Sequence, residues 1–103
     1  MDKYIIVRTF CDKEDIANRI IVTLLEKKLV AGSQLSKVHS TYWWNNEIEV
    51  CDEFKMEFRS KESLFSRIVK EIKNIHDYDV AEISYCEIDG ANEEFLKWID
   101  ENV

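Results

Sequence analysis

The run TYWWNNEIEVCDEFKMEFR, residues 41–59, carries the clearest structural signal in this sequence. Asn45 and Asn46 separate an aromatic segment from a second extended run, and asparagine tolerates positive φ angles better than most residues. The run therefore predicts a β-hairpin with its turn at these two asparagines. After the turn, apolar and polar residues alternate, which predicts a strand with one dry face and one wet face. The dry face comprises Ile48, Val50, Phe54, Met56 and Phe58, and the wet face comprises Glu49, Cys51, Glu53, Lys55, Glu57 and Arg59.

The N-terminal part predicts a strand followed by a helix. Residues 4–10 are β-branched or aromatic at nearly every position, which is typical of a strand covered on both faces. Asp12 is the expected N-cap of the helix, with Glu14 and Asp15 in its first turn, where the helix dipole favours anions. The helix ends near the lysines at 27–28 and carries one apolar stripe. The stripe comprises Ile16, Ala17, Ile20, Ile21, Leu24 and Leu25.

The segment 29–44, which leads into the hairpin turn, has an extended pattern with an irregular start. Gly32 and the largely polar stretch 33–37 predict a bulge or a bend there, because glycine inside a strand often marks such a site.

The C-terminal half predicts a second helix, a strand and a short third helix. Ser60 is the expected cap of the second helix, and residues 76–79 end it. Residues 80–88 predict the last core strand, Asp89-Gly90 predicts a turn, and Asn92 is the expected cap of the final helix. The apolar stripe of the second helix comprises Leu64, Phe65, Ile68, Val69, Ile72 and Ile75, and that of the third comprises Phe95, Leu96 and Ile99.

The order of these elements predicts one α+β domain over residues 1–103, a ferredoxin-like β-α-β-β-α-β sandwich with a long central hairpin and a short C-terminal helix. Arms of roughly 15 residues at about 3.3 Å each would project beyond a domain of this size. Because the hairpin also carries three adjacent aromatic residues, we expect other subunits to cover it.

Composition narrows the classes of partner and compartment. With 46% apolar residues the chain can form a substantial core, and its net charge of −7 argues against a phosphate-binding surface. That charge suits a cationic or basic partner, or it simply keeps the protein soluble. We expect a cytoplasmic protein, since no signal peptide or membrane-spanning run is recognisable. Cys11, Cys51 and Cys86 lack the spacing of a zinc site and predict reduced, partly buried thiols.

Two groups of residues are candidates for function. The aromatic cluster 42–44 favours a subunit contact, with a ligand pocket as the alternative. The segment 76–82 gathers an imidazole, a phenol and three carboxylates, so His76 is a candidate ligand for a divalent cation. No second histidine stands at metal-site spacing, and His39 could join it only through the fold. Common catalytic and nucleotide-binding motifs are absent, which argues against an enzyme and predicts no catalytic residue.

Five motifs in order give the chain a resemblance to the CutA divalent-cation-tolerance family, which extends over nearly its full length. They are Thr9-Phe10-Cys11-Asp12-Lys13-Glu14, Leu29-Val30-Ala31, Tyr42-Trp43-Trp44 with Ile48-Glu49, His76-Asp77-Tyr78-Asp79-Val80-Ala81-Glu82-Ile83, and Phe95-Leu96-Lys97-Trp98-Ile99. They resemble the family patterns Thr-x-Pro-Asp-Glu-Glu, Leu-Ala-Ala, Tyr-x-Trp-x-Gly-Lys-Ile-Glu, His-Pro-Tyr-x-Val-Pro-Glu-Ile and Tyr-Leu-x-Trp-Ile.

The resemblance implies a cytoplasmic homotrimer, assembled through its long hairpins and linked to tolerance of, or response to, divalent metal ions such as copper. It also implies a likeness to the trimers of PII signalling proteins, and hence a signalling or ligand-binding module. A scaffold for a protein partner, without metal or ligand, is the alternative. By position, the candidate residues of an inter-subunit cleft are Trp43, Trp44, Glu49, His76, Tyr78 and Glu82.

The chain departs from the family pattern at several positions. It contains no proline, so Cys11, Asp77 and Ala81 stand where the family motifs have one. Gly32 follows the Leu-Val-Ala motif in place of cysteine, and Glu47 replaces the hairpin lysine. The cysteines of this chain do not match the family cysteines proposed as soft ligands, which argues against copper binding through thiolates.

Overall fold

The structure, a computed structural model, describes residues 2–103 and contains one four-stranded sheet with the order β2-β3-β1-β4. Every neighbouring pair is antiparallel. The strands are β1 (Tyr4–Cys11), β2 (Gly32–Trp44), β3 (Glu47–Lys61) and β4 (Ile83–Glu87). The helices are α1 (Glu14–Glu26), α2 (Phe65–Ile75, after a 3₁₀ turn at Glu62–Leu64) and α3 (Glu93–Asn102). This arrangement confirms the predicted ferredoxin-like α+β fold with its C-terminal helix.

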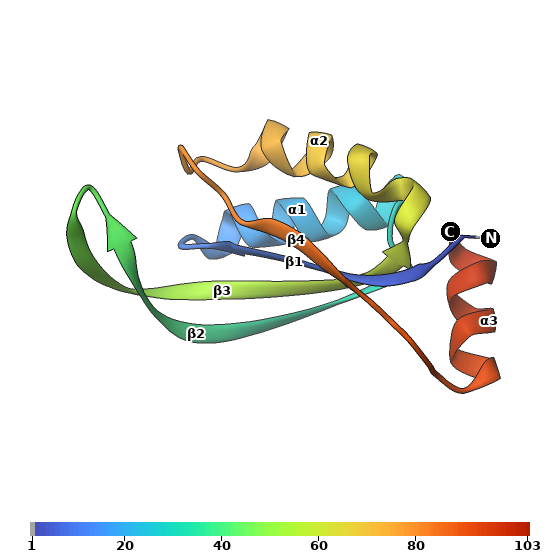
Figure 1. The fold of residues 1–103 in the computed structure, drawn as a ribbon. Helices are drawn as coiled ribbons and strands as arrows, with labels where there is room; N and C mark the ends of the chain where they lie inside the picture. Colours follow the sequence, from blue (N-terminus) through green and yellow to red (C-terminus); the bar gives the residue numbers. More distant parts are fainter. Residues whose placement is uncertain (1) are drawn as a thin grey trace.

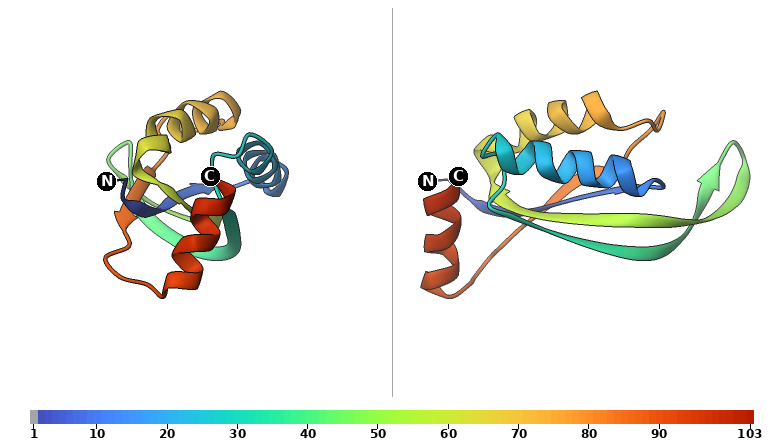
Figure 2. Two further views of the ribbon diagram at one scale, coloured as in Figure 1. Left: turned by 90° about the vertical axis from the view of Figure 1, so that its right-hand side faces the viewer. Right: turned by 180° about the vertical axis from the view of Figure 1, so that it is seen from behind.

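The core lies between the sheet and the two longer helices. Figure 1 shows α1 and α2 side by side on one face of the sheet, with α3 at the far end from the hairpin. Strand β1 alternates strictly between buried and half-buried residues, so Ile5, Val7, Thr9 and Cys11 face the helices. The right-hand view in Figure 2 shows that no helix of the described residues covers the central part of the other sheet face.

The predicted hairpin forms, and its turn is the one expected. Asn45 and Asn46 have φ angles of 50° and 63°, the left-handed values of a two-residue type I′ turn. The pairing of β2 with β3 runs without a break from Gly32 opposite Arg59 to Trp44 opposite Glu47. The predicted bulge at residues 32–37 is therefore wrong; the chain bends at Ala31, before the strand begins.

Two predicted helix caps are also wrong. Lys13, not Asp12, holds the N-cap position of α1, and its side chain makes no capping hydrogen bond. Ser60 lies in β3, fully buried, and its hydroxyl donates to the carbonyl of Leu29 at 2.6 Å. The turn that leads into α2 is held instead by the carboxylate of Asp2, which accepts hydrogen bonds from the backbone and hydroxyl of Ser63.

The last strand is shorter than predicted. Residues 80–82 are not part of β4, and Val80 is 71% exposed. Residues 88–92 form an irregular connection without the predicted turn at Asp89-Gly90. Asn92 does occupy the N-cap position of α3, but its amide donates to the carboxylate of Glu94 rather than capping the backbone. Because β4 begins only at Ile83, segment 78–82 does not pair with the sheet and lies close to the hairpin.

The three cysteines are free and differ in exposure. Cys11 is buried, Cys51 is half-buried and Cys86 is exposed, so the prediction of partly buried thiols is wrong for Cys86. None of the helices in the described part of the chain is long and apolar enough to cross a bilayer.

Candidate functional site

A cavity of about 850 Å³ lies between the outer part of the β2–β3 hairpin and the segment 78–82 that connects α2 to β4. Its size is within the usual range for small-molecule sites. Figure 1 shows the hairpin and the α2–β4 connection at the same end of the molecule. The cavity is lined by Phe10, Ser40, Thr41, Tyr42, Trp43, Trp44, Glu49, Glu53, Tyr78, Asp79, Val80, Ala81 and Glu82.

The backbone of segment 78–82 is attached to the sheet at one end. The hydroxyl of Thr9, fully buried in β1, donates to the carbonyl of Glu82 at 2.7 Å. The pairing of Thr9 with Ile83 then begins β4. This attachment holds the wall of the cavity that faces the hairpin.

Tyr78 and Glu53 join the two sides of the cavity. The Tyr78 hydroxyl donates to Oε2 of Glu53 at 2.8 Å, and Glu53 is only 7% exposed. Burial, followed by this hydrogen bond, raises the pKa of Tyr78 well above its ordinary value. The phenol is therefore a permanent donor to a buried carboxylate at neutral pH.

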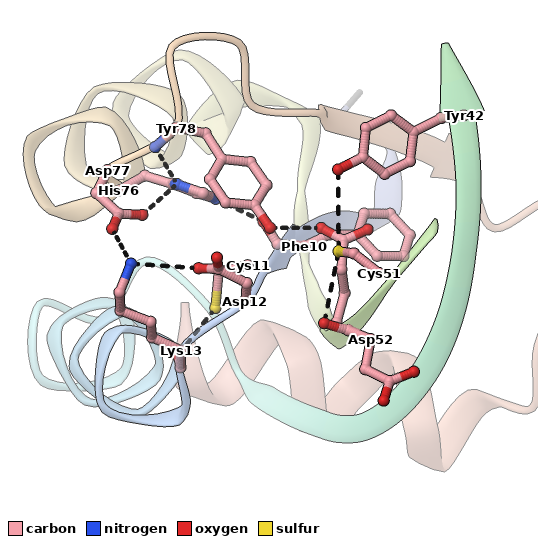
Figure 3. A network of polar contacts seen from close by, with 11 residues as sticks. Phe10, Cys11, Asp12, Lys13, Tyr42, Cys51, Asp52, His76, Asp77 and Tyr78 are labelled. Atoms are coloured by element: carbon pink, nitrogen blue, oxygen red, sulfur yellow. Dashed lines mark hydrogen bonds and ion pairs between the residues drawn. The ribbon is translucent and has the colours of Figure 1, made fainter. Parts of the chain in front are cut away.

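His76 lies behind the cavity wall and supports Tyr78. Its Nε2 donates to the carbonyl of Phe10, and its Nδ1 accepts the backbone N–H of Tyr78 at 3.1 Å (Figure 3). A carbonyl can only accept and an amide N–H can only donate, so the ring is in the neutral Nε2–H tautomer. The imidazole is almost fully buried, and both nitrogens are used. The metal role predicted for His76 stays a prediction, which this geometry disfavours.

An ion pair braces the same corner. The ammonium of Lys13 lies 2.6 Å from the carboxylate of Asp77, next to His76 (Figure 3). This hydrogen bond lowers the pKa of Asp77 and raises that of Lys13. Both side chains are largely exposed, so the pair contributes little to stability.

The thiols near the cavity are poor candidates for soft metal ligands. Burial raises the pKa of Cys11, whose thiol donates to the carbonyl of Lys13 at 3.2 Å. Cys51 lies under the Tyr42 hydroxyl, with 3.9 Å between oxygen and sulfur (Figure 3). Within residues 2–103, no three histidine, cysteine or acidic side chains converge as metal ligands.

The structure brings five of the six candidate cleft residues around this one cavity. Trp43, Trp44 and Glu49 come from the hairpin, and Tyr78 and Glu82 come from the opposite wall. His76 is the exception, since its ring contacts the main chain instead.

Sequence reasoning did not select the most buried charge of the site. The alternation of β3 predicts Glu53 on the wet face of the strand and Ile48 and Val50 on the dry face. Both predictions are wrong, because Glu53 is 7% exposed whereas Ile48 and Val50 are 61% and 55% exposed. Residues 49, 51 and 53 share one strand face, but Glu53 is buried there because Tyr78, from the segment that follows α2, lies across from it. Phe10 and Asp79 were likewise not selected as site residues.

Comparison with known proteins places the chain in a family. The model of the CutA1 divalent ion tolerance protein matches residues 5–102. The divalent-cation tolerance protein CutA of Pyrococcus horikoshii is 35% identical over 97 residues, which cover 94% of each chain. The CutA protein of Archaeoglobus fulgidus is 38% identical over 87 residues, covering 84% of this chain and 85% of the relative.

Solved structures agree with this assignment. The periplasmic divalent cation tolerance protein CutA from Archaeoglobus fulgidus has a TM-score of 0.93 and 32% identity, with 96% of this chain and 97% of that chain covered. CutA1 from the psychrotrophic bacterium Shewanella sp. SIB1 has a TM-score of 0.92 and 32% identity over 97% and 94% of the two chains. The names of the Pyrococcus horikoshii and Archaeoglobus fulgidus proteins describe tolerance of divalent cations. The chain belongs to the CutA1 divalent ion tolerance protein family.

Proposed function

We propose that this protein acts in divalent-cation tolerance as a homotrimeric ligand-binding module, and that the cavity between the hairpin and segment 78–82 is its binding site. The observation that carries the proposal is the convergence of two separate family motifs, Tyr42-Trp43-Trp44 and the run 76–83, on one cavity. Aromatic walls with a few carboxylates are typical of small-ligand sites.

The outer hairpin supports assembly. Trp43, Ile48 and Val50 are 72%, 61% and 55% exposed, and Trp43 and Ile48 are direct partners across the two strands. An apolar surface of this kind on a projecting hairpin is usually covered by another protein surface. Closed symmetric assembly of identical chains is the commonest way to cover it, and the family resemblance suggests three copies.

The identity of the divalent cation that the trimer would bind is also a proposal. Copper is the candidate suggested by the resemblance, but no cluster of metal-ligand residues is found in the described part of a single chain. A copper site would therefore combine carboxylates or imidazoles from more than one copy, with His39 and its neighbour Asp52 available on the exposed hairpin. A signalling role like that of the PII proteins would follow if the bound state were read by a partner.

We further propose a cytoplasmic, non-enzymatic protein. Three free thiols suit a reducing compartment, although the Archaeoglobus fulgidus structure is described as periplasmic. Cell fractionation with a compartment marker tests this location, and recovery in a periplasmic or membrane fraction would contradict it.

Light scattering behind size exclusion, with and without copper, tests the assembly. We expect a stable mass of about three times 12.3 kDa in both conditions. Calorimetric titration with copper then tests the ligand-binding half. A monomeric mass would overturn the assembly, and the absence of heat and of thermal stabilisation would overturn copper binding.

The second candidate is a trimeric scaffold for another protein, with no metal or small ligand. The exposed aromatic surface of the hairpin favours it, since aromatic residues anchor protein interfaces. A pull-down that recovers one specific partner, lost in Trp43→Ala/Trp44→Ala while the trimer persists, would support the scaffold over the ligand-binding module.

A further inference from the structure

We infer that the cavity binds a small organic cation with at least one N–H donor, and that Glu53 is its counter-ion. The inference rests on the proposed function in one respect, the use of this cavity as the binding site. It adds the chemical class of the ligand and the residue that recognises it.

Glu53 is a buried charge without a counter-charge. It is 7% exposed, yet no lysine, arginine or histidine of the described chain lies within ion-pair distance of it. Among the described residues, its side chain makes a single hydrogen bond, which joins Oε2 to the hydroxyl of Tyr78. Burying a carboxylate in this way is costly unless a cation or further donors compensate it.

The second oxygen of Glu53 is solvent-accessible and has no hydrogen-bond partner among the described residues. No fully buried side-chain oxygen or nitrogen lacks a hydrogen-bond partner among residues 2–103, and Oε1 has no partner in the chain. Oε1 must therefore reach accessible surface, and Glu53 lines the cavity. A free acceptor there, beside an occupied Oε2, is suited to a ligand that carries an N–H group.

The remaining wall selects for positive charge. Glu49, Asp79 and Glu82 add three carboxylates, and none of the described residues that line the cavity is basic. An anionic ligand would meet four carboxylates and no cation, so this wall disfavours phosphates and carboxylic acids.

The aromatic part of the wall distinguishes an organic cation from a metal ion. Five aromatic side chains line the cavity, and ammonium or guanidinium groups bind well to aromatic faces. They are Phe10, Tyr42, Trp43, Trp44 and Tyr78. A bare metal ion needs several converging ligands, which residues 2–103 of a single chain do not supply, and it would leave most of an 850 Å³ cavity unfilled.

Calorimetric titration of the wild-type protein with three probes tests the inference. 1,4-Diaminobutane carries two ammonium groups, 1,4-butanediol has the same chain without charge, and magnesium chloride supplies the same double charge without carbon. We expect saturable binding of the diamine only. Binding of the diol as strong as that of the diamine, or equal binding of magnesium, would overturn the inference, because neither result needs Glu53 to recognise an N–H cation.

Substitution of Glu53 then locates the binding. Glu53→Gln should weaken diamine binding by at least about tenfold, the size of one charge-assisted hydrogen bond. Glu26→Gln, an exposed position at the end of α1, is the matched control and should leave binding unchanged. Equal affinity of the Glu53→Gln variant, or an equal loss in the control, would overturn the inference.

Two further results separate this inference from the proposed function. If Glu53→Gln changes the solution mass, the counter-charge of Glu53 belongs to a neighbouring subunit. That result rules out the organic cation, but it does not contradict the proposed homotrimer. If copper binds in a Glu53-dependent manner and the diamine does not bind, the cavity is a ligand site for a metal and the inference fails. Should Glu53→Gln not fold, Trp44→Leu tests the aromatic wall, and unchanged diamine affinity in that variant would contradict the inference.

Discussion

The surroundings of single residues around the cavity are set by the segment on its opposite side, as Glu53 and Tyr78 show. Glu53 follows the alternation of β3 onto the polar strand face, where it would be solvated in an isolated hairpin. Tyr78, 25 residues later, covers that position and donates to the carboxylate. His76 in turn accepts the backbone N–H of Tyr78 and donates to Phe10, so the phenol is held from behind. The environment of Glu53 is thus set by its neighbours across the cavity.

Thr9 provides a residue-scale prediction, because its buried hydroxyl is the link between β1 and the cavity wall at Glu82. Thr9→Val keeps the shape and removes the donor, and we expect the free energy of unfolding to fall by about 1 kcal/mol. Urea denaturation at fixed protein concentration measures it. Thr9→Ser, which keeps the hydroxyl, should retain this hydrogen bond, and an unchanged stability of Thr9→Val would show that the link is dispensable.

At the scale of elements, the hairpin is more regular than its sequence suggested. Gly32 and the mostly polar stretch 33–37 predict an interruption, yet β2 pairs with β3 from end to end. Gly32 has a different reason: a Cβ at this position would lie 2.7 Å from the ring of Trp98 in α3. The glycine allows the C-terminal helix to approach the sheet closely, so its cause is a tertiary contact.

The hairpin turn gives the first element-scale prediction. Both Asn45 and Asn46 have left-handed backbone angles, and glycine adopts these more easily than any other residue. Asn46→Gly should leave the free energy of unfolding unchanged or raise it slightly, whereas Asn46→Ala should lower it by about 1 kcal/mol. Thermal denaturation of the two variants beside the wild type measures this, and a more stable alanine variant would contradict the turn type.

The contact that attaches α3 to the strands gives the second element-scale prediction. Lys61 and then Tyr4 donate to the carboxylate of Asp100 and lower its pKa below the usual value of 3.8. The stability from this contact is therefore fully present above about pH 4 and is lost as the pH falls through the lowered pKa. Asp100→Asn should reduce stability at pH 7, and the difference from wild type should shrink below pH 4.

Denaturation with urea at pH 7, 4 and 3 measures that difference. Asp89→Asn, an exposed carboxylate without a hydrogen bond or ion pair in the described chain, is the control and should show no such change. A difference between Asp100→Asn and wild type that stays constant with pH would contradict the role of the charge. High salt should weaken the effect, because the pair is partly exposed.

At the scale of the whole molecule, the hairpin makes the protein elongated. Its extents are 44 × 26 × 22 Å, and Figure 1 shows the hairpin projecting beyond the part of the sheet that α1 and α2 cover. The apolar residues of the outer hairpin lie outside the core. They alternate with polar residues along β3, but no helix of the described chain packs on them. This exposed apolar surface at one end of an elongated domain is the basis of the proposed assembly.

The corresponding prediction concerns the solution mass. If the hairpin surface is an assembly contact, Trp43→Ser/Ile48→Ser should lower the mass measured by light scattering toward 12.3 kDa. Val22→Ser removes an apolar residue that is 50% exposed on α1, and it should not change the mass. A double variant that keeps the full assembly would show that copies meet elsewhere.

The sequence by itself determined the elements and their order. Local periodicity was sufficient for α1, α2 and the hairpin, because apolar spacing and the tolerance of asparagine for positive φ act over a few neighbouring residues. The prediction of helix caps from local sequence was wrong at Ser60 and Asp12. Ser60 lies within β3, and Lys13 holds the N-cap position of α1. The sequence motifs also selected five of the thirteen residues that line the cavity, namely Trp43, Trp44, Glu49, Tyr78 and Glu82. Only the tertiary structure decided that Glu53 is buried, that Ile48 is exposed and that His76 has no free nitrogen, because each depends on which distant segment lies across from it.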